Sequence, residues 1–139
     1  MRIQTVLVPW ILFSAPLSAR AQEHHDEELG SVTFPVTCSA PAQAHMHRAV
    51  AMLHSFWFQE ARKTFESALQ ADSTCGIAYW GVALTHFGNP MAGGSTGPAQ
   101  AAGWEAAQKG AQAGGRSERD RAYIDAAVAL FRDQSTVDN

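Results

Sequence analysis

Histidine and cysteine are the residues of this sequence most able to do chemistry, and metal binding is the chemistry that they first suggest. The chain contains six histidines and two cysteines. Neutral imidazole and thiolate are the usual zinc ligands in proteins. Because the ligands of one ion must converge, their spacing on the elements that carry them decides whether such a site can form.

The histidine spacings do not place two ligands side by side on one helix. His45 and His47 are two positions apart, so on a helix they point to different faces. His47 and His54 share a face, but seven residues at 1.5 Å each separate them by about 10.5 Å. His54 and His86 fall on neighbouring predicted helices and remain the candidate metal ligands. The alternative is that both are hydrogen-bonded in the core or at its edge.

A second histidine cluster lies near the start of the chain. His24 and His25 are surrounded by acidic residues in the stretch QEHHDEELG, which has no apolar periodicity. Unstructured clusters of this kind can hold a divalent cation loosely. The composition favours the other interpretation, a solvated polar leader.

The first residues have the build of a secretory signal peptide. Arg2 precedes an apolar run that ends near Leu17, and the small residues Ala19 and Ala21 suit cleavage. Prolines interrupt the run, which is shorter than the roughly 20 residues that span a bilayer. We expect residues 1–21 to be removed on export to the periplasm or outside the cell, leaving no membrane span. A membrane anchor is the alternative.

The charge balance argues against nucleic acid as a partner. The formal net charge is −3, and removal of residues 1–21 takes away two arginines and leaves a more acidic chain. The sequence therefore has no basic stripe to neutralise phosphates.

Motifs of catalysis are absent from the sequence. It has no HExxH zinc motif, no glycine-rich phosphate loop, no nucleophile elbow and no CxxCH haem attachment. Cys38 and His47 could in principle form a thiol and imidazole pair. A disulfide with Cys75 is the better use of Cys38 in an exported chain. We therefore expect a protein that is not an enzyme and uses no cofactor.

Most of the chain has the periodicity of helices. Residues 22–40 form a polar leader and a short lead-in, whose Phe34 we expect to pack against the first helix. Helical patterns then fall in residues 42–53, 58–69, 76–87, 98–113 and 117–131; the third of these is apolar nearly all round and the fourth is rich in alanine. We predict an all-α fold of about five helices in residues 41–133, followed by a tail at residues 134–139.

The second predicted helix has the spacing of a tetratricopeptide repeat. Ala61, Phe65 and Ala68 match the A-x3-F-x2-A pattern of that repeat. A step of about 34 residues, the repeat length, leads from Ala49 to Ala83, both small. Small residues at these positions let two helices approach closely. We therefore predict stacked antiparallel helical hairpins.

The same arrangement predicts a disulfide. Cys38 precedes the first helix and Cys75 precedes the third, which should run parallel to the first one repeat on. The two helix starts should be neighbours. A bond closing this loop would contribute about 3 to 4 kcal/mol in the chain-entropy model. Two buried, reduced cysteines are the alternative.

The stretch LHSFWFQEARKTFESALQADSTCGIAYWGVALTH resembles the signature of a family of exported bacterial tetratricopeptide-repeat proteins. LGSVTFPVTCSAP and RDRAYIDAAVALFRD are similar to that family's lead-in and later helix, so the resemblance covers most of residues 29–133. Ser73 stands where the family commonly has proline, and Phe56 where the repeat usually has an interhelix glycine. The family is largely uncharacterised and its members are usually longer. The resemblance thus implies a tetratricopeptide fold, with this chain as the first portion of a longer array.

These expectations assign function to a surface. In tetratricopeptide arrays the first helix of each repeat lines the concave side, which here would carry Met46, Val50, Trp80 and Leu84. Because these residues are apolar, we predict a non-enzymatic module that binds an apolar or helical protein segment. A later helix, such as the one carrying Trp104, would remove the groove if it covered this side.

A metal-binding role is the alternative from another functional class. It would make the chain an exported metal-binding protein, or the noncatalytic head of a larger secreted enzyme, with His54 and His86 as the residues involved.

Overall fold

The computed structural model describes the backbone of residues 29–137 and the side chains of residues 29–132. Its helices are α1 (Ala40–His54), α2 (Phe58–Ala71), α3 (Ile77–Phe87), α4 (Gly97–Ala113) and α5 (Glu118–Val137), with a 3₁₀ turn, η1 (Pro90–Ala92), between α3 and α4. This described part has no strand, so the prediction of an all-α fold with about five helices is confirmed.

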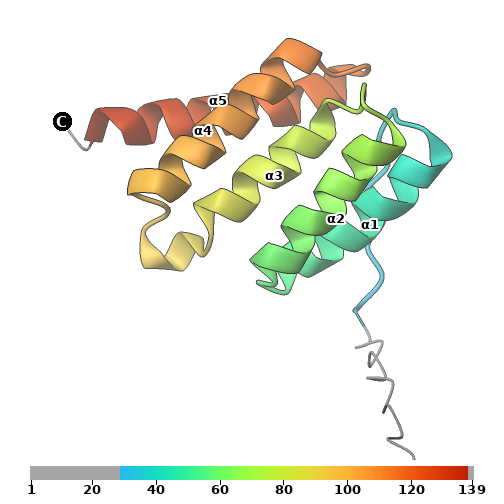
Figure 1. Ribbon diagram of the computed structural model, residues 1–139, viewed down its shortest axis with the longest axis horizontal. Helices are drawn as coiled ribbons and strands as arrows, with labels where there is room; N and C mark the ends of the chain where they lie inside the picture. The colour runs from blue at the N-terminus through green and yellow to red at the C-terminus, as the bar shows by residue number, and fades with distance from the viewer. Residues whose placement is uncertain (1–28, 138–139) are drawn as a thin grey trace, which may run out of the picture.

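The helices pack as neighbouring pairs. α1 packs against α2, α3 against α4, and α4 against α5, and α3 also contacts α1, α2 and α5. Figure 1 shows α2, α3 and α4 in a row, with α1 behind α2 and α5 behind α4. The helices α1 and α5 therefore flank one side of α3, which we call the inner surface.

The predicted boundaries differ from the structure mainly at the C-terminal end. The helix α5 continues to Val137, whereas the sequence interpretation ended the helical domain at residue 133 and left residues 134–139 as a tail. No glycine or proline follows Phe131, so nothing in the local sequence stops the helix there. The connection between α3 and α4 contains η1, which begins where the Asn89 side chain accepts a hydrogen bond from the Met91 N–H.

The core consists of small residues where helices cross and of large side chains beside them. Ala61, Phe65 and Ala68 are fully buried, and so are the two alanines predicted at the other crossing positions, Ala49 and Ala83. The Phe65 ring packs directly on α3, where a Cβ at residue 81, a glycine, would lie 2.3 Å from that ring. The helices of this core can therefore pack closely only because small residues occupy the positions where they cross.

Several sequence expectations concern residues beyond this description. The expected signal peptide at residues 1–21 and the cluster at His24 and His25 lie outside the described residues. Among the helices that are described, none combines the length and the apolar character that crossing a membrane requires.

Candidate binding groove

Three of the four residues predicted to form an open concave face are buried. Met46 is 0%, Val50 2% and Trp80 8% exposed, and Leu84 is half-buried. The prediction that these residues together form an exposed binding face was therefore wrong for Met46 and Val50, and only a small part of Trp80 is exposed. At Trp80 the cause is a cover over the middle of the inner surface.

The cover is the chain's own lead-in together with α5. Phe34 is buried and its ring stacks on Trp80 of α3, with centroids 5.3 Å apart and planes 7° from parallel. The edge of Tyr123, from α5, meets the same ring at 5.3 Å, and the Arg119 guanidinium lies over it at 4.6 Å. Phe34 thus packs against α3 and α5 rather than against the first helix alone. The helix carrying Trp104 is not what covers this ring.

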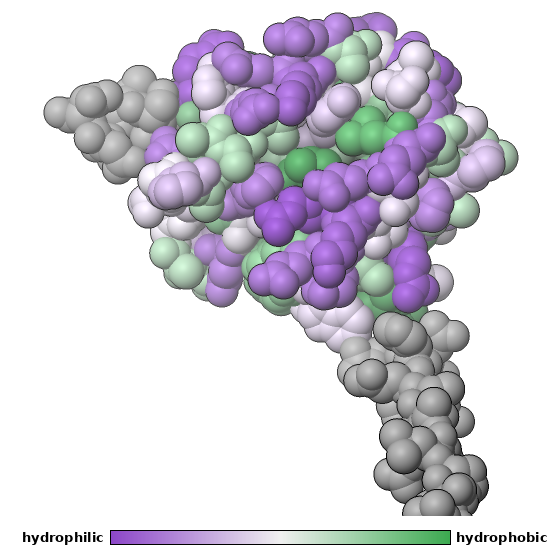
Figure 2. All heavy atoms as spheres, in the orientation of Figure 1, coloured by the Kyte–Doolittle hydropathy of each residue, from purple (hydrophilic) through white to green (hydrophobic). Residues whose placement is uncertain are grey.

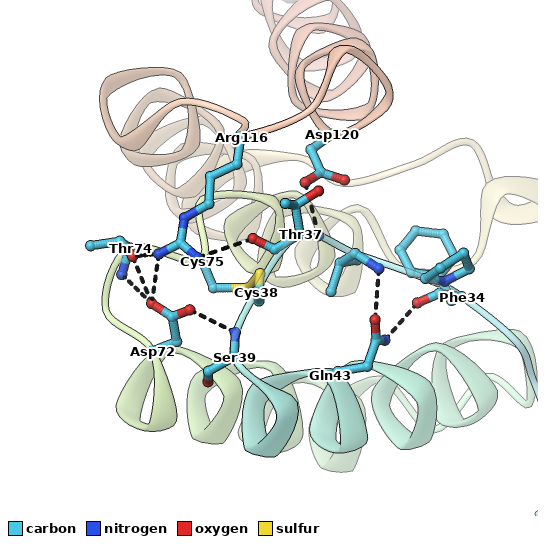
Figure 3. Close-up of a disulfide and its surroundings, with 12 residues drawn as sticks. Phe34, Thr37, Cys38, Ser39, Gln43, Asp72, Thr74, Cys75, Arg116 and Asp120 are labelled. Atoms are coloured by element: carbon cyan, nitrogen blue, oxygen red, sulfur yellow. Dashed lines mark hydrogen bonds and ion pairs between the residues drawn. A yellow bond between two sulfur atoms is a disulfide. The ribbon is translucent and has the colours of Figure 1, made fainter.

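Side chains of α1 and α5 bind the backbone of the lead-in. The Gln43 amide donates to the Phe34 carbonyl and accepts from the Val36 N–H, both at 2.8 Å (Figure 3). These are the two kinds of bond that a neighbouring β-strand would make. The Asp120 carboxylate accepts from the Thr37 N–H at 3.2 Å. The inner surface therefore binds this segment through its backbone, through the Phe34 ring and through partly buried aliphatic side chains.

A disulfide closes the end of the lead-in. Cys38 and Cys75 are bonded, with their Cα atoms 5.3 Å apart, so the bond favoured by the sequence is present in the structure. Next to it, the Asp72 carboxylate accepts from the Ser39 N–H at 2.9 Å and is bridged by Arg116 at 3.3 Å (Figure 3). Hydrogen bonds from the Thr74 hydroxyl and the Ser39 N–H lower the pKa of Asp72, and Arg116 adds to this effect.

Beyond the lead-in the inner surface stays open as an apolar groove. It has a volume of about 360 Å³ and lies where the ends of α1, α3 and the first turn of α2 meet α5. The large apolar side chains that line it are Leu53, Phe56, Phe58, Trp80, Leu84, Phe87 and Leu130. Two of the four predicted binding residues, Trp80 and Leu84, therefore do line a surface depression. It is displaced from the centre of the inner surface to one end.

The two exposed large apolar residues within the described part of the chain lie beside this groove. Phe56 is 57% and Met91 89% exposed. Phe56 lines the groove from the α1–α2 turn, and Met91 follows Pro90, another lining residue. Figure 1 shows this turn and η1 at the same, lower edge of the molecule. The groove thus opens into an apolar edge, which we call the Phe56–Met91 edge.

Phe56 also has an unusual backbone. Its φ is 61°, and it is the one non-glycine residue with positive φ among those that the structure describes. A side chain in this left-handed region costs roughly 1–2 kcal/mol. From the sequence, Phe56 is only the residue that stands where the repeat usually has an interhelix glycine. The usable signal was an aromatic residue at a position where the repeat has glycine.

The structure does not bring His54 and His86 together. His54 lines the groove, whereas His86 lines a separate depression with Glu66, Tyr79 and other residues of α2, α3 and α4. Arg62 donates to Nδ1 of His86 at 3.3 Å. Burial lowers the pKa of His86, the Arg62 charge lowers it further, and Glu66 opposes the shift. No three His, Cys, Asp or Glu side chains within the described residues are grouped for metal binding.

The face of the molecule opposite the inner surface is mainly polar. Figure 2 shows hydrophilic side chains across the face carried by α2 and α4, with small apolar areas between them. Lys109 and Glu105 of α4 form an exposed ion pair at 2.7 Å. Exposed pairs of this kind contribute little to stability and are typical of a solvated face.

Comparisons of the chain with protein-family models, with curated proteins and with solved structures each gave no match. The tetratricopeptide resemblance therefore stays a prediction.

Proposed function

We propose that this protein is a non-enzymatic binding module that holds an apolar segment of a protein partner in the groove between α1, α3 and α5. The observation that carries this proposal is the apolar groove of about 360 Å³ that opens into the Phe56–Met91 edge. Grooves that bind ligands are lined mainly by aliphatic and aromatic side chains and occupy roughly 300–1,000 Å³.

The exposed apolar edge supports a binding role. Two features of Phe56 are unfavourable in free energy: its ring is exposed to water and its backbone is left-handed. Strained and exposed apolar residues concentrate at functional sites, because burial against a partner recovers the exposed area. Met91, almost fully exposed on the neighbouring loop, extends the area that a partner would bury.

The site of action follows from the sequence. We place the protein in the periplasm or outside the cell, as the expected signal peptide implies, and describe it as a tetratricopeptide-like scaffold on the strength of the resemblance. The disulfide between Cys38 and Cys75 supports this placement, since such bonds persist in oxidising compartments.

Selection from a random peptide library tests the function directly. The immobilised protein is expected to enrich peptides that share large apolar anchors, and Leu84→Glu should weaken their binding at least 10-fold, because it puts a charge into the groove. Leu69→Glu is the matched control, since Leu69 is also a half-buried helical leucine but lies outside the groove. Absence of enrichment, or binding that is unchanged in a folded Leu84→Glu variant, would overturn the proposal.

A further inference from the structure

The lead-in lies on the inner surface in the way that a peptide ligand lies on its receptor. We infer that the part of the inner surface beneath residues 34–37, which we call the lead-in site, is a second peptide-binding site, and that these residues are a built-in ligand that keeps it closed. The partner that fits this site is a non-helical protein segment with an aromatic residue followed by proline. The lead-in site lies beside the groove, so this inference does not depend on the proposed function.

Side chains of α1 and α5 bind the backbone in the first part of the segment. The Gln43 amide donates to the Phe34 carbonyl and accepts from the Val36 N–H. The Pro35 carbonyl between them accepts from the Arg119 guanidinium. Each of these contacts is made to a main-chain group. A partner segment of different sequence can therefore make the same contacts.

Two further side chains bind the backbone of Thr37. Arg116 donates to its carbonyl at 3.1 Å, and the Asp120 carboxylate accepts from its N–H at 3.2 Å (Figure 3). Asp120 is only 2% exposed. A buried carboxylate is costly without hydrogen-bond donors. The lead-in site therefore selects a segment that supplies an N–H at this position.

The side chain of Phe34 adds a requirement for an aromatic residue. Its ring lies 5.3 Å from the rings of both Trp80 and Tyr123, and the Arg119 guanidinium lies over it at 4.6 Å. Aromatic pairs and cation–π contacts stabilise a bound ring beyond the burial of its area. An aliphatic side chain would fill this space without these interactions. The lead-in site is thus matched to an aromatic anchor.

The pattern of hydrogen bonds determines where the partner segment can carry proline. At Pro35 the site binds the carbonyl, and proline has no N–H to offer. The next two residues, Val36 and Thr37, each donate their N–H to the site. Proline is therefore accepted directly after the aromatic residue and excluded from the two positions that follow.

The position of the segment in the chain allows it to leave the site. Residues 34–37 belong to no helix, and Arg116 and Arg119, which bind two of their carbonyls, are exposed. The bond between Cys38 and Cys75 joins the chain just after the segment to the start of α3. Release of residues 34–37 would therefore open the lead-in site while the disulfide keeps this junction closed.

A peptide added to the disulfide-bonded protein tests this inference. The probe has the sequence of residues 31–37; one control peptide carries Phe34→Ala and the other Val36→Pro. The proteins are the wild type and Phe34→Ala, whose built-in ligand lacks its ring. Binding is followed by NMR through the ring signals of Tyr123, in the lead-in site, and the methyl signals of Leu130, in the groove.

The probe is expected to bind the Phe34→Ala protein at least 10-fold more tightly than the wild type, because the built-in ring no longer competes. It should shift the signals of Tyr123 but not those of Leu130, and both control peptides should bind at least 10-fold more weakly than the probe. Equal affinities for the two proteins, or shifts centred on Leu130, would overturn the inference, since the probe would then bind elsewhere.

Two other results would also overturn it. One is a Val36→Pro peptide that binds as tightly as the probe, and the other is no binding of the probe to the folded variant. If the Phe34→Ala protein loses its helicity, Phe34→Leu takes its place with the same expectation, because leucine keeps apolar bulk without the ring. Loss of helicity in both variants would overturn the inference as well, since Phe34 would then be part of the fold and not a ligand.

Discussion

Phe56 is the residue whose identity the stability of the fold explains least. Its backbone is left-handed and its ring is more than half exposed, beside the groove. Glycine would adopt this conformation without strain. A binding role explains why an aromatic residue stands here, because its ring is placed to be buried by a partner.

Two substitutions at Phe56 separate the backbone strain from the ring. Phe56→Gly and Phe56→Ala both remove the ring, but only glycine relieves the strain, so the glycine variant should be about 1 kcal/mol more stable than the alanine variant. Both variants should bind groove peptides more weakly than the wild type. Urea unfolding and a peptide titration measure the two effects. Equal stability of the two variants would show that the position is not strained.

Gly81 is required for the contact between α2 and α3. A Cβ at this position would lie 2.3 Å from the ring of the fully buried Phe65. We expect Gly81→Ala to lower the free energy of unfolding by about 2 kcal/mol, although alanine favours a helix by about 1 kcal/mol. Combining it with Phe65→Leu should cost less than the two single effects added together, because the clash is then absent. Simple additivity in denaturant unfolding would contradict this.

Among the elements, the lead-in is the segment that is not helical. Its position on the inner surface limits the open groove to one end. Side chains of α1 and α5 satisfy its backbone, and the disulfide joins its end to the start of α3. It therefore ties together three helices that are distant in the sequence. Its effects should appear in stability as well as in binding.

Loss of the disulfide should destabilise the fold strongly. The bonded cysteines are 37 positions apart, and a loop of this size corresponds to about 4 kcal/mol in the chain-entropy model. The double variant Cys38→Ser, Cys75→Ser should lose about this amount in urea unfolding compared with the oxidised protein. If the two unfolding midpoints coincide, the bond does not contribute to the stability of the fold.

Acid should weaken the junction between the lead-in, α2 and the α4–α5 loop. The pKa of Asp72 is lowered in the folded state, so its stabilising contribution is present above the unfolded value of 3.8 and is lost as the pH falls through the folded pKa. Asp72→Asn should therefore reduce the fall in stability between pH 5 and pH 2, measured by thermal unfolding. An unchanged pH dependence in this variant would contradict the assignment.

For the whole molecule, the helices were predictable because their signals are local. The three-and-four periodicity and the spacing of Ala61, Phe65 and Ala68 predicted helices and crossing positions that the structure contains. The binding face was not predictable, since the lead-in and α5 that cover it are held by contacts between residues distant in the sequence. The carboxylate of Asp120 that binds the Thr37 N–H is 83 positions away. Periodicity identified Met46 and Val50 as apolar but could not tell that both are buried in the core. Nor could it tell that the lead-in and α5 cover Trp80.

The location of the groove at one end has the same explanation. The lead-in covers the middle of the inner surface, so the apolar residues that stay accessible are those near the ends of α1 and α3, such as Leu53 and Leu84. Neither Phe56 nor Met91 could be placed beside them from sequence, because each belongs to a different turn. The packing of α1 and α2 against α3 brings these turns to one edge (Figure 1).

Calorimetric titration of a library-selected peptide into the wild type, Leu84→Glu and Leu69→Glu proteins tests the central claim most directly. The account predicts binding with a negative heat-capacity change, as expected when apolar surface is buried. It also predicts an affinity at least 10-fold lower for Leu84→Glu and within about 2-fold of wild type for Leu69→Glu; all three proteins must show the same helicity. Equal affinities for the wild type and Leu84→Glu would contradict the account, because the peptide would then bind outside the groove.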